Sequence, residues 1–176
     1  LTGIDAVRVL KDREYRLFTV GEMGIGNTTT SSAVASVLLR KEPELVTGCG
    51  AGLDLAGLKR KTKAIRRGID LHQPDPMDGM DVLQKVGGFD LAAMAGAFLG
   101  GAIYHVPVVI DGVIAAAAAA AAGRIAPAAT DYMLAAHVSA EPASIWLLDL
   151  IGVTPAIRAG LRLGEGTGAL ALFPLL

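Results

Sequence analysis

Short runs of β-branched and aromatic residues alternate along the chain with longer runs whose apolar residues recur at the period of an α-helix. Strands are predicted at residues 15–20 (YRLFTV) and 106–112 (VPVVIDG), and a short strand followed by a loop within residues 131–142. Helices are predicted at residues 28–39, 53–71, 76–88 and 89–105, in the alanine-rich run after residue 112, and at the end of residues 160–176. This alternation predicts one α/β domain over residues 1–176, with a mainly parallel sheet covered by helices on both faces.

Each loop that is rich in functional groups directly follows a predicted strand. These loops are residues 21–30, 111–112 and 137–141. Ligands of parallel α/β sheets bind at the carboxyl ends of the strands, where such loops meet. The positions of the three loops therefore predict one shared crevice.

The first loop, VGEMGIGNTTTSS, has almost the spacing of a nucleotide-binding P-loop. Gly21, Gly26 and Thr28 stand where that motif requires them, but Asn27 occupies the position of its lysine. Glu22 also places a carboxylate inside the loop. A P-loop uses its lysine to hold the β- and γ-phosphates, so this loop is better suited to a monophosphate than to a triphosphate.

A glycine loop that leads into a helix presents unpaired backbone N–H groups and the positive end of the helix dipole to an anion. Gly24 and Gly26 allow the backbone to approach a ligand closely, and Thr28, Thr29 and Thr30 add hydroxyl donors. The same residues also fit a simple strand-to-helix turn with a capping threonine. The spacing alone favours neither interpretation.

A second glycine loop, LGEGTG, places Glu165 between glycines and ahead of another predicted helix. Apolar sequence on both sides predicts that this carboxylate is partly desolvated, which favours a role as a base. A capping or solvated glutamate is the ordinary alternative for Glu165 considered alone. Two Gly-Glu turns in one small domain, at Glu22 and Glu165, favour a functional role, with Gly166 beside the second carboxylate.

The predicted helix at residues 53–71 carries an apolar stripe and six basic residues. The stripe consists of Leu55, Leu58, Thr62, Ile65 and Ile69. Most of the basic residues belong to a solvated face, as charge runs usually do. At 100° per residue, Lys61 lies beside the stripe, whereas Arg60 and Arg67 point away. Lys61 is therefore the candidate to reach inward towards an anion.

Three further polar residues are candidates because of their positions after strands. Asp111 ends the strongest predicted strand and either contacts a ligand or caps the alanine-rich helix. Ser139 is predicted near the start of a helix that opens at Glu141, where its hydroxyl could donate to a phosphate. His137 has no cysteine or histidine at metal-ligand spacing, so we interpret it as structural and predict no metal site.

Composition and charge narrow the class of protein. The chain of 176 residues is 52% hydrophobic with a mean hydropathy of +0.50, so it can bury a sizeable core. A net charge of −1 argues against a nucleic-acid binder. Cys49, which we interpret as inert, leaves no partner for an internal disulfide and favours the cytoplasm. No signal segment is predicted, and Pro107 and Asp111 interrupt the longest apolar run, so no membrane span is predicted.

Five segments together resemble one enzyme family over essentially the whole chain and in the same order. They are GEMGIGNTTTSSA, VGGFDLAAMAGAFLG, VPVVIDG, AHVSAEP and LRLGEGTGA. They are similar to the signature segments of the nicotinate-nucleotide–dimethylbenzimidazole phosphoribosyltransferases, which act in assembly of the lower ligand of cobalamin. The resemblance implies a three-layer α/β/α Rossmann-like fold, a homodimer and no cofactor. It also implies transfer of phosphoribose from nicotinate mononucleotide to a base, giving an α-riboside phosphate.

The resemblance also implies roles for individual residues. The catalytic glutamate of the family falls on Glu165 and its second active-site glutamate on Glu22. The phosphate and ribose contacts fall on the remaining candidates, which are Gly24, Gly26, Asn27, Thr28, Lys61, Asp111, Ser139 and Gly166. Family members are longer, and this chain resembles their C-terminal half.

Several alternatives remain open at the level of sequence. The acceptor could be 5,6-dimethylbenzimidazole, another benzimidazole, a phenol or adenine. A protein that binds a nucleotide without catalysis would need the same phosphate loop. A P-loop kinase or NTPase is disfavoured by Asn27 and by the lack of a convincing magnesium-binding aspartate after a matched strand.

Overall fold

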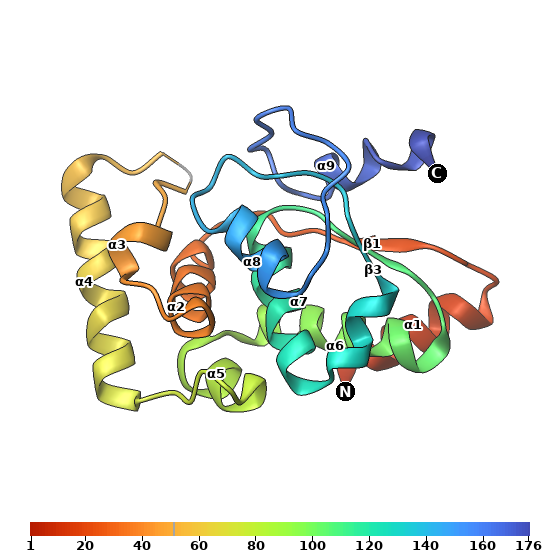
Figure 1. Cartoon of the computed structure of the whole chain (residues 1–176), viewed down its shortest axis with the longest axis horizontal. Helices are drawn as coiled ribbons and strands as arrows, with labels where there is room; N and C mark the ends of the chain where they lie inside the picture. Colours follow the sequence, from red (N-terminus) through yellow and green to blue (C-terminus); the bar gives the residue numbers. More distant parts are fainter. Residues whose placement is uncertain (51) are drawn as a thin grey trace.

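The computed structural model describes residues 1–50 and 52–176 (Figure 1). It contains a three-stranded parallel sheet in the order β1-β2-β3. The strands are β1 (Phe18–Val20), β2 (Val108–Ile110) and β3 (Met133–Ala135). Thr19, Val109 and Leu134 lie side by side in the register of the sheet. The predicted α/β class with a parallel sheet is confirmed. Each strand has only three residues, so the strands are shorter than the sequence pattern predicted.

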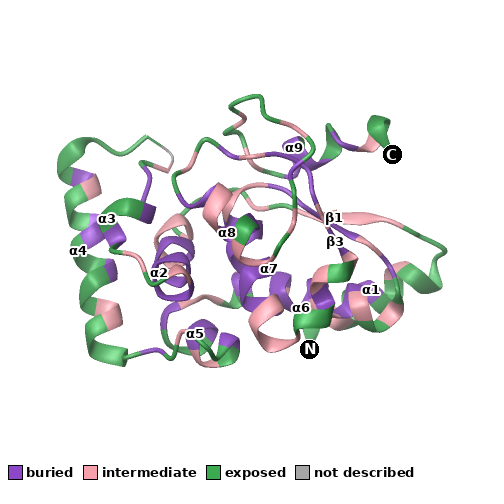
Figure 2. Ribbon diagram, viewed as in Figure 1, coloured by how far each residue is buried: buried purple, intermediate pink, exposed green. Residues whose placement is uncertain are grey.

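The alanine-rich segment forms the central helix of the molecule, α7 (Val113–Ile125). All eight alanines from Ala115 to Ala122 are at most 2% exposed, so this helix is buried on every side (Figure 2). The helices that surround it are α2 (Thr28–Leu39), α5 (Gly79–Val86), α6 (Phe89–Tyr104) and α8 (Ser144–Leu150). Alanine suits this position because its small side chain lets neighbouring helices approach closely while keeping a high helix propensity.

Helices of very different length cover the two faces of the sheet. The first face contacts the main core through α6 (Phe89–Tyr104) and α7, and α1 (Thr2–Asp12) packs against α6. The second face carries a small cluster of Val109, Ala136, Ala169 and Leu172. Ala169 belongs to α9 (Thr167–Leu170), and Phe173 of the 3-10 turn η2 (Phe173–Leu175) packs against the cluster.

The sequence pattern was wrong about two of these helices. It did not predict α1. It also predicted an apolar helix at the end of the chain, where α9 (Thr167–Leu170) has only four residues. The three residues before Thr167 have left-handed backbone, so the helix cannot begin earlier, and after Leu170 the chain continues through a turn into the 3-10 turn that contains Pro174.

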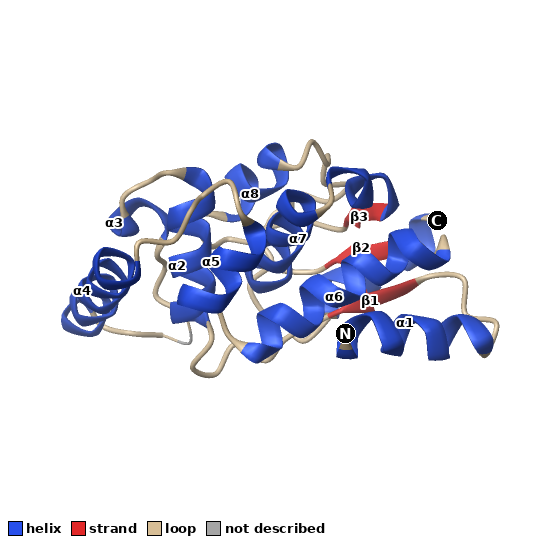
Figure 3. Ribbon diagram, turned by 90° about the horizontal axis from the view of Figure 1, so that it is seen from below, coloured by secondary structure: helices blue, strands red, loops and turns tan. Residues whose placement is uncertain are grey.

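The remaining helices extend away from the sheet, and α4 (Leu55–His72) lies at the end of the molecule farthest from the strands (Figure 3). The others are α2 (Thr28–Leu39), α3 (Pro43–Val46), α5 (Gly79–Val86) and α8 (Ser144–Leu150). The buried face of α4 contains Gly57, Lys61, Thr62 and Ile65, whereas Leu55 is 79% exposed. The predicted stripe was therefore wrong at its first residue, which lies in the first turn, ahead of the region that packs against α2.

No helix within the described residues is both long enough and apolar enough to span a membrane.

Candidate active site

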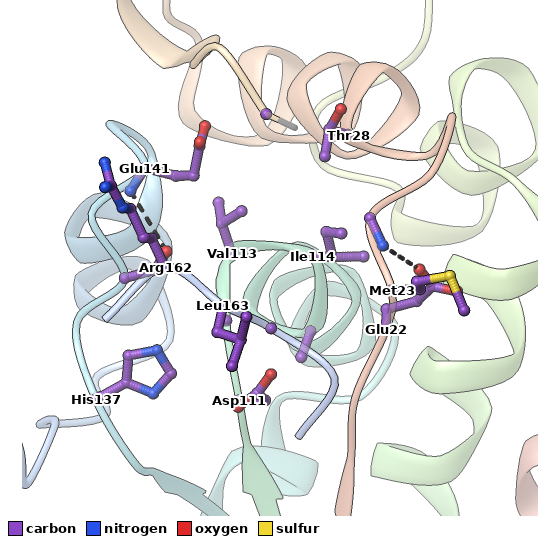
Figure 4. A pocket seen from close by; sticks show the side chains of 16 residues that line it. Glu22, Met23, Thr28, Asp111, Val113, Ile114, His137, Glu141, Arg162 and Leu163 are labelled. Carbon is purple, nitrogen blue, oxygen red and sulfur yellow. Dashed lines mark hydrogen bonds between the residues drawn. The ribbon is translucent and has the colours of Figure 1, made fainter. Parts of the chain in front are cut away.

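One pocket, with about 720 Å³ of empty space, lies at the carboxyl ends of the three strands (Figure 4). Its walls come from the loops that follow β1, β2 and β3 and from the segment before α9. The prediction of one shared crevice is confirmed. Its cause is that parallel strands direct their following loops to one edge of the sheet. Of the residues predicted for the site, the pocket is lined by Glu22, Gly24, Thr28, Asp111 and Ser139.

The first glycine loop leads into α2, and its backbone N–H groups from Ile25 to Thr30 have no hydrogen-bond partner among the described residues, whereas that of Gly24 is engaged by Glu22. Gly24 and Gly26 have φ values of +85° and +84°, a left-handed conformation that glycine adopts at little cost. Among the residues that the structure describes, no side chain caps the start of α2. The hydroxyl of Thr30 donates back to Asn27 O at 3.0 Å, so its hydrogen bond lies within the first turn of α2. Thr28, by contrast, lines the pocket. An uncapped helix start beside a pocket is suited to an anion.

Asn27 is oriented towards α6 in this structure. Its Nδ2 donates to Asp90 Oδ2 at 2.8 Å, and its Oδ1 is buried without a hydrogen-bond partner among the described residues. Asp90 lies in the first turn of α6, and sequence reasoning did not identify it as part of the site. The Asn27–Asp90 bond ties the start of α2 to α6, so the amide of Asn27 helps to position the loop.

Lys61 extends from α4 to the end of the first glycine loop. It is only 7% exposed, and its Nζ donates to Thr28 Oγ1 and to Gly48 O, both at 3.1 Å. Arg60 and Arg67, by contrast, are exposed. The orientation predicted from helix phase is confirmed. Burial lowers the pKa of the Lys61 ammonium below its ordinary value of 10.5, and the nearby carboxylate of Glu141 opposes that shift.

The two glycine loops lie back to back at the rim of the pocket. The backbone N–H of Glu165 donates to Glu22 O at 3.0 Å. Gly21 packs so closely on the backbone of Gly166 that a Cβ atom at residue 21 would overlap it. The side chain of Glu22 is fixed by its own loop, because Oε2 accepts from the N–H of Gly24 at 2.8 Å. Glu22 therefore lines the pocket, and Glu165 lies next to it, beyond the lining residue Gly164.

Glu165 is exposed, so the predicted desolvation of its carboxylate was wrong. It is the middle of three consecutive residues with positive φ: Gly164 at +80°, Glu165 at +58° and Gly166 at +78°. This left-handed run turns the side chain outward, next to Gly164, which lines the pocket. The apolar residues on both sides are adjacent in sequence only, and they do not cover the carboxylate.

Asp111 holds the second glycine loop in place. It is 3% exposed, and its carboxylate accepts from Gly166 N at 3.1 Å and from Ala169 N at 2.9 Å. It therefore caps α9, and the cap of the alanine-rich helix considered from sequence was wrong. Since both carboxylate oxygens serve this cap, Asp111 acts on the pocket mainly by positioning Glu165 and its neighbours.

Ser139 lies at the pocket wall after β3. Its N–H donates to Ser144 Oγ at 3.0 Å, and its own Oγ accepts from Glu141 N at 3.3 Å. Within the described part of the chain, the hydroxyl proton of Ser139 has no acceptor, so it can donate to a ligand. The helix predicted to open at Glu141 begins three residues later, at Ser144.

Sequence reasoning missed two charged residues of the pocket, Glu141 and Arg162. They stand on the side of the pocket opposite Glu22 (Figure 4). The available signal was positional: Glu141 belongs to a loop that follows a strand, and Arg162 directly precedes the second glycine loop.

His137 is a buried histidine in the pocket wall. It is 4% exposed, its Nδ1 has no hydrogen-bond partner among the described residues, and its ring packs against Gly168, where no Cβ would fit. Burial lowers the pKa of His137 below its ordinary value of 6.5, and the negative charge of Asp111 opposes that shift. Within the described residues, no group of three potential metal ligands is present.

This shift predicts a pH-dependent stability. The lowered pKa means that the unfolded state binds more protons just below pH 6.5, so the free energy of unfolding falls as the pH drops through that window. We expect His137→Gln to flatten this dependence, measured by urea unfolding at a series of pH values. His72→Gln, at an exposed histidine, is the control and should leave the slope unchanged. Equal slopes for the wild type and the His137 variant would contradict the prediction.

The sequence of this chain is similar to those of known phosphoribosyltransferases. A family model described as phosphoribosyltransferase matches residues 1–176. The chain is 48% identical over 175 residues to nicotinate-nucleotide–dimethylbenzimidazole phosphoribosyltransferase of Ruminiclostridium cellulolyticum, covering 99% of this chain and 50% of the relative. It is 50% identical over 167 residues to the protein of the same name from Desulforudis audaxviator, covering 95% of this chain and 47% of the relative.

The fold of this chain is also similar to that of a solved structure. The crystal structure of CobT from Thermus thermophilus superimposes with a TM-score of 0.92 at 39% identity, covering 98% of this chain and 52% of that one. This chain therefore spans about half the length of the relatives that it matches.

Proposed function

Because this chain belongs to the nicotinate-nucleotide–dimethylbenzimidazole phosphoribosyltransferase family, we propose that it forms the phosphoribosyl-binding part of such an enzyme. The reaction transfers phosphoribose from nicotinate mononucleotide to 5,6-dimethylbenzimidazole or a related base, in assembly of the lower ligand of cobalamin. The products are nicotinate and an α-riboside 5′-phosphate. The observation that carries this proposal is the convergence of Lys61 and the uncapped start of α2 on Thr28, beside the loops of Glu22 and Glu165.

The 5′-phosphate of the nucleotide is proposed to bind at the start of α2. Backbone N–H groups from Ile25 onward, the hydroxyl of Thr28 and the ammonium of Lys61 are near this position, and Ser139 lies across the pocket. A single phosphate needs no P-loop lysine at residue 27, because the cation arrives from α4. This arrangement combines the helix dipole with a charge-assisted hydrogen bond.

The chemistry needs orientation and one base. The bond between C1′ and the pyridinium nitrogen breaks, and its electron pair neutralises the positive charge of that ring nitrogen, so nicotinate leaves without an acid. The incoming azole attacks C1′ from the opposite face with one ring nitrogen, which inverts the anomeric carbon. Its other nitrogen loses a proton, and Glu165 at the pocket rim is the proposed acceptor. A positioned base contributes about 10²–10⁴-fold, and the rest of the acceleration comes from holding both substrates in line.

The finer assignments also belong to the proposal. We infer a homodimer that acts in the cytoplasm on small molecules and has no nucleic-acid partner. The single cysteine supports the assignment to the cytoplasm, and the net charge of −1 supports the absence of a nucleic-acid partner.

The direct test is to incubate the full-length protein with nicotinate mononucleotide and a panel of acceptors. The panel contains 5,6-dimethylbenzimidazole, unsubstituted benzimidazole, adenine and a phenol, and chromatography measures released nicotinate and riboside phosphate. We expect stoichiometric formation of both products with at least the benzimidazoles. Tight binding of the nucleotide without release of nicotinate, for every acceptor, would instead support a non-catalytic nucleotide-binding protein.

A further inference from the structure

Three carboxylates line a pocket that we propose to bind a phosphate, and they differ in how they are engaged. Both oxygens of Asp111 accept backbone N–H groups, and one oxygen of Glu22 does the same. The carboxylate of Glu141 has no hydrogen bond or ion pair to any described residue, and only the backbone of Glu141 is engaged, with Ser139 and Ser144. Glu141 is thus a free acceptor in the pocket wall.

The surroundings of Glu141 keep its carboxylate in the pocket. The carboxylate lies against Gly48, where a Cβ would overlap it, and the residue is half-buried. Its negative charge raises the pKa of Lys61, so the two groups are within electrostatic reach although they form no ion pair. Figure 4 shows Glu141 approaching the pocket from the side opposite Glu22.

A free carboxylate near Lys61 is unfavourable for binding a phosphate alone, because the two anions repel each other. It must therefore serve a part of the ligand that donates hydrogen bonds. In a ribosyl phosphate the neutral donors nearest the phosphate are the cis 2- and 3-hydroxyls. A carboxylate accepts from such hydroxyls through charge-assisted bonds, and it accepts from a ribose hydroxyl in dinucleotide-binding sites as well.

We propose that Glu141 determines the sugar specificity of this pocket by accepting hydrogen bonds from the cis-diol of ribose. The pocket then selects ribose over 2-deoxyribose, while Lys61 and the start of α2 hold the phosphate. This inference rests on the proposed function only in that the ligand is a ribosyl phosphate, and it does not require turnover.

The test is calorimetric binding of three probes to the full-length protein: ribose 5-phosphate, 2-deoxyribose 5-phosphate and inorganic phosphate. We expect the wild type to bind ribose 5-phosphate about 10-fold more tightly than the 2-deoxy sugar, the order of one hydrogen bond to a charged group. Glu141→Gln should reduce this preference to about 3-fold or less, and Glu141→Ala should abolish it. Inorganic phosphate should bind both variants as tightly as the wild type or more tightly, because a repelling charge is gone.

Glu14→Gln is the matched control, since Glu14 is an exposed carboxylate without a partner among the described residues, and it should retain the full preference. An unchanged ribose preference in both Glu141 variants would overturn the proposal. So would equal weakening of all three probes, which would mean that Glu141 only orders Lys61 or the loop. If the wild type prefers ribose but does not turn over nicotinate mononucleotide, the proposed reaction fails while the role of Glu141 stands.

Discussion

Replacing Glu165 with glutamine is expected to lower kcat by about 10²-fold or more in the full-length protein, with little change in the affinity for nicotinate mononucleotide. Glutamine keeps the shape of the side chain but cannot accept the azole proton in the transition state. The loop itself should survive the change, because its contacts use backbone atoms: Glu165 N–H to Glu22 O, and Gly166 N–H to Asp111. Steady-state kinetics together with nucleotide binding separate the two effects.

Glu14→Gln is a matched control for this variant as well. Glu14 is exposed and has a φ of +67°, close to the +58° of Glu165, so the same chemical change is made at the same kind of backbone position. It should leave kcat unaltered. The parallel variant Glu22→Gln tests the other carboxylate at the rim. Unchanged kcat in the Glu165 variant, with an inactive Glu22 variant, would move the role of base to Glu22.

Replacing Lys61 with alanine is expected to weaken nicotinate mononucleotide binding by about 10- to 100-fold, the range of one or more hydrogen bonds to a charged group. The ammonium is buried and is already directed at Thr28 Oγ1, so its removal takes a charged donor away from the start of α2. Lys61→Met keeps the packing of the aliphatic stem and should show the same loss. Isothermal calorimetry with the nucleotide measures both variants.

Arg60→Ala is the control for Lys61, because Arg60 precedes it on the same helix and is exposed. Its effect on binding should be small and should disappear at high salt, since exposed charges are screened. Equal losses for Arg60→Ala and Lys61→Ala would contradict the site. They would mean that α4 attracts the nucleotide only through its overall positive charge.

Local pattern predicted most elements near the pocket because their signals are strong and short in range. The helix predicted at residues 28–39 is α2 (Thr28–Leu39), and the run VPVVIDG contains β2. The phase of α4 correctly separated Lys61 from Arg60, since a 3.6-residue period assigns each side chain to a face. The end of the chain was predicted poorly, because its apolar residues do not reveal the left-handed run at Gly164 to Gly166.

The sequence by itself determined which residue types stand after each strand, and therefore which groups can meet at the carboxyl edge of a parallel sheet. Only the tertiary structure decided which of them do meet and how each is used. Lys61 reaches Thr28 across 33 residues of chain, Asp111 caps a helix 55 residues onward, and Asn27 bonds to Asp90 across 63. The physical reason is that periodicity reports the face of an element, whereas the partner of a side chain, and its exposure to water, depend on how distant elements pack.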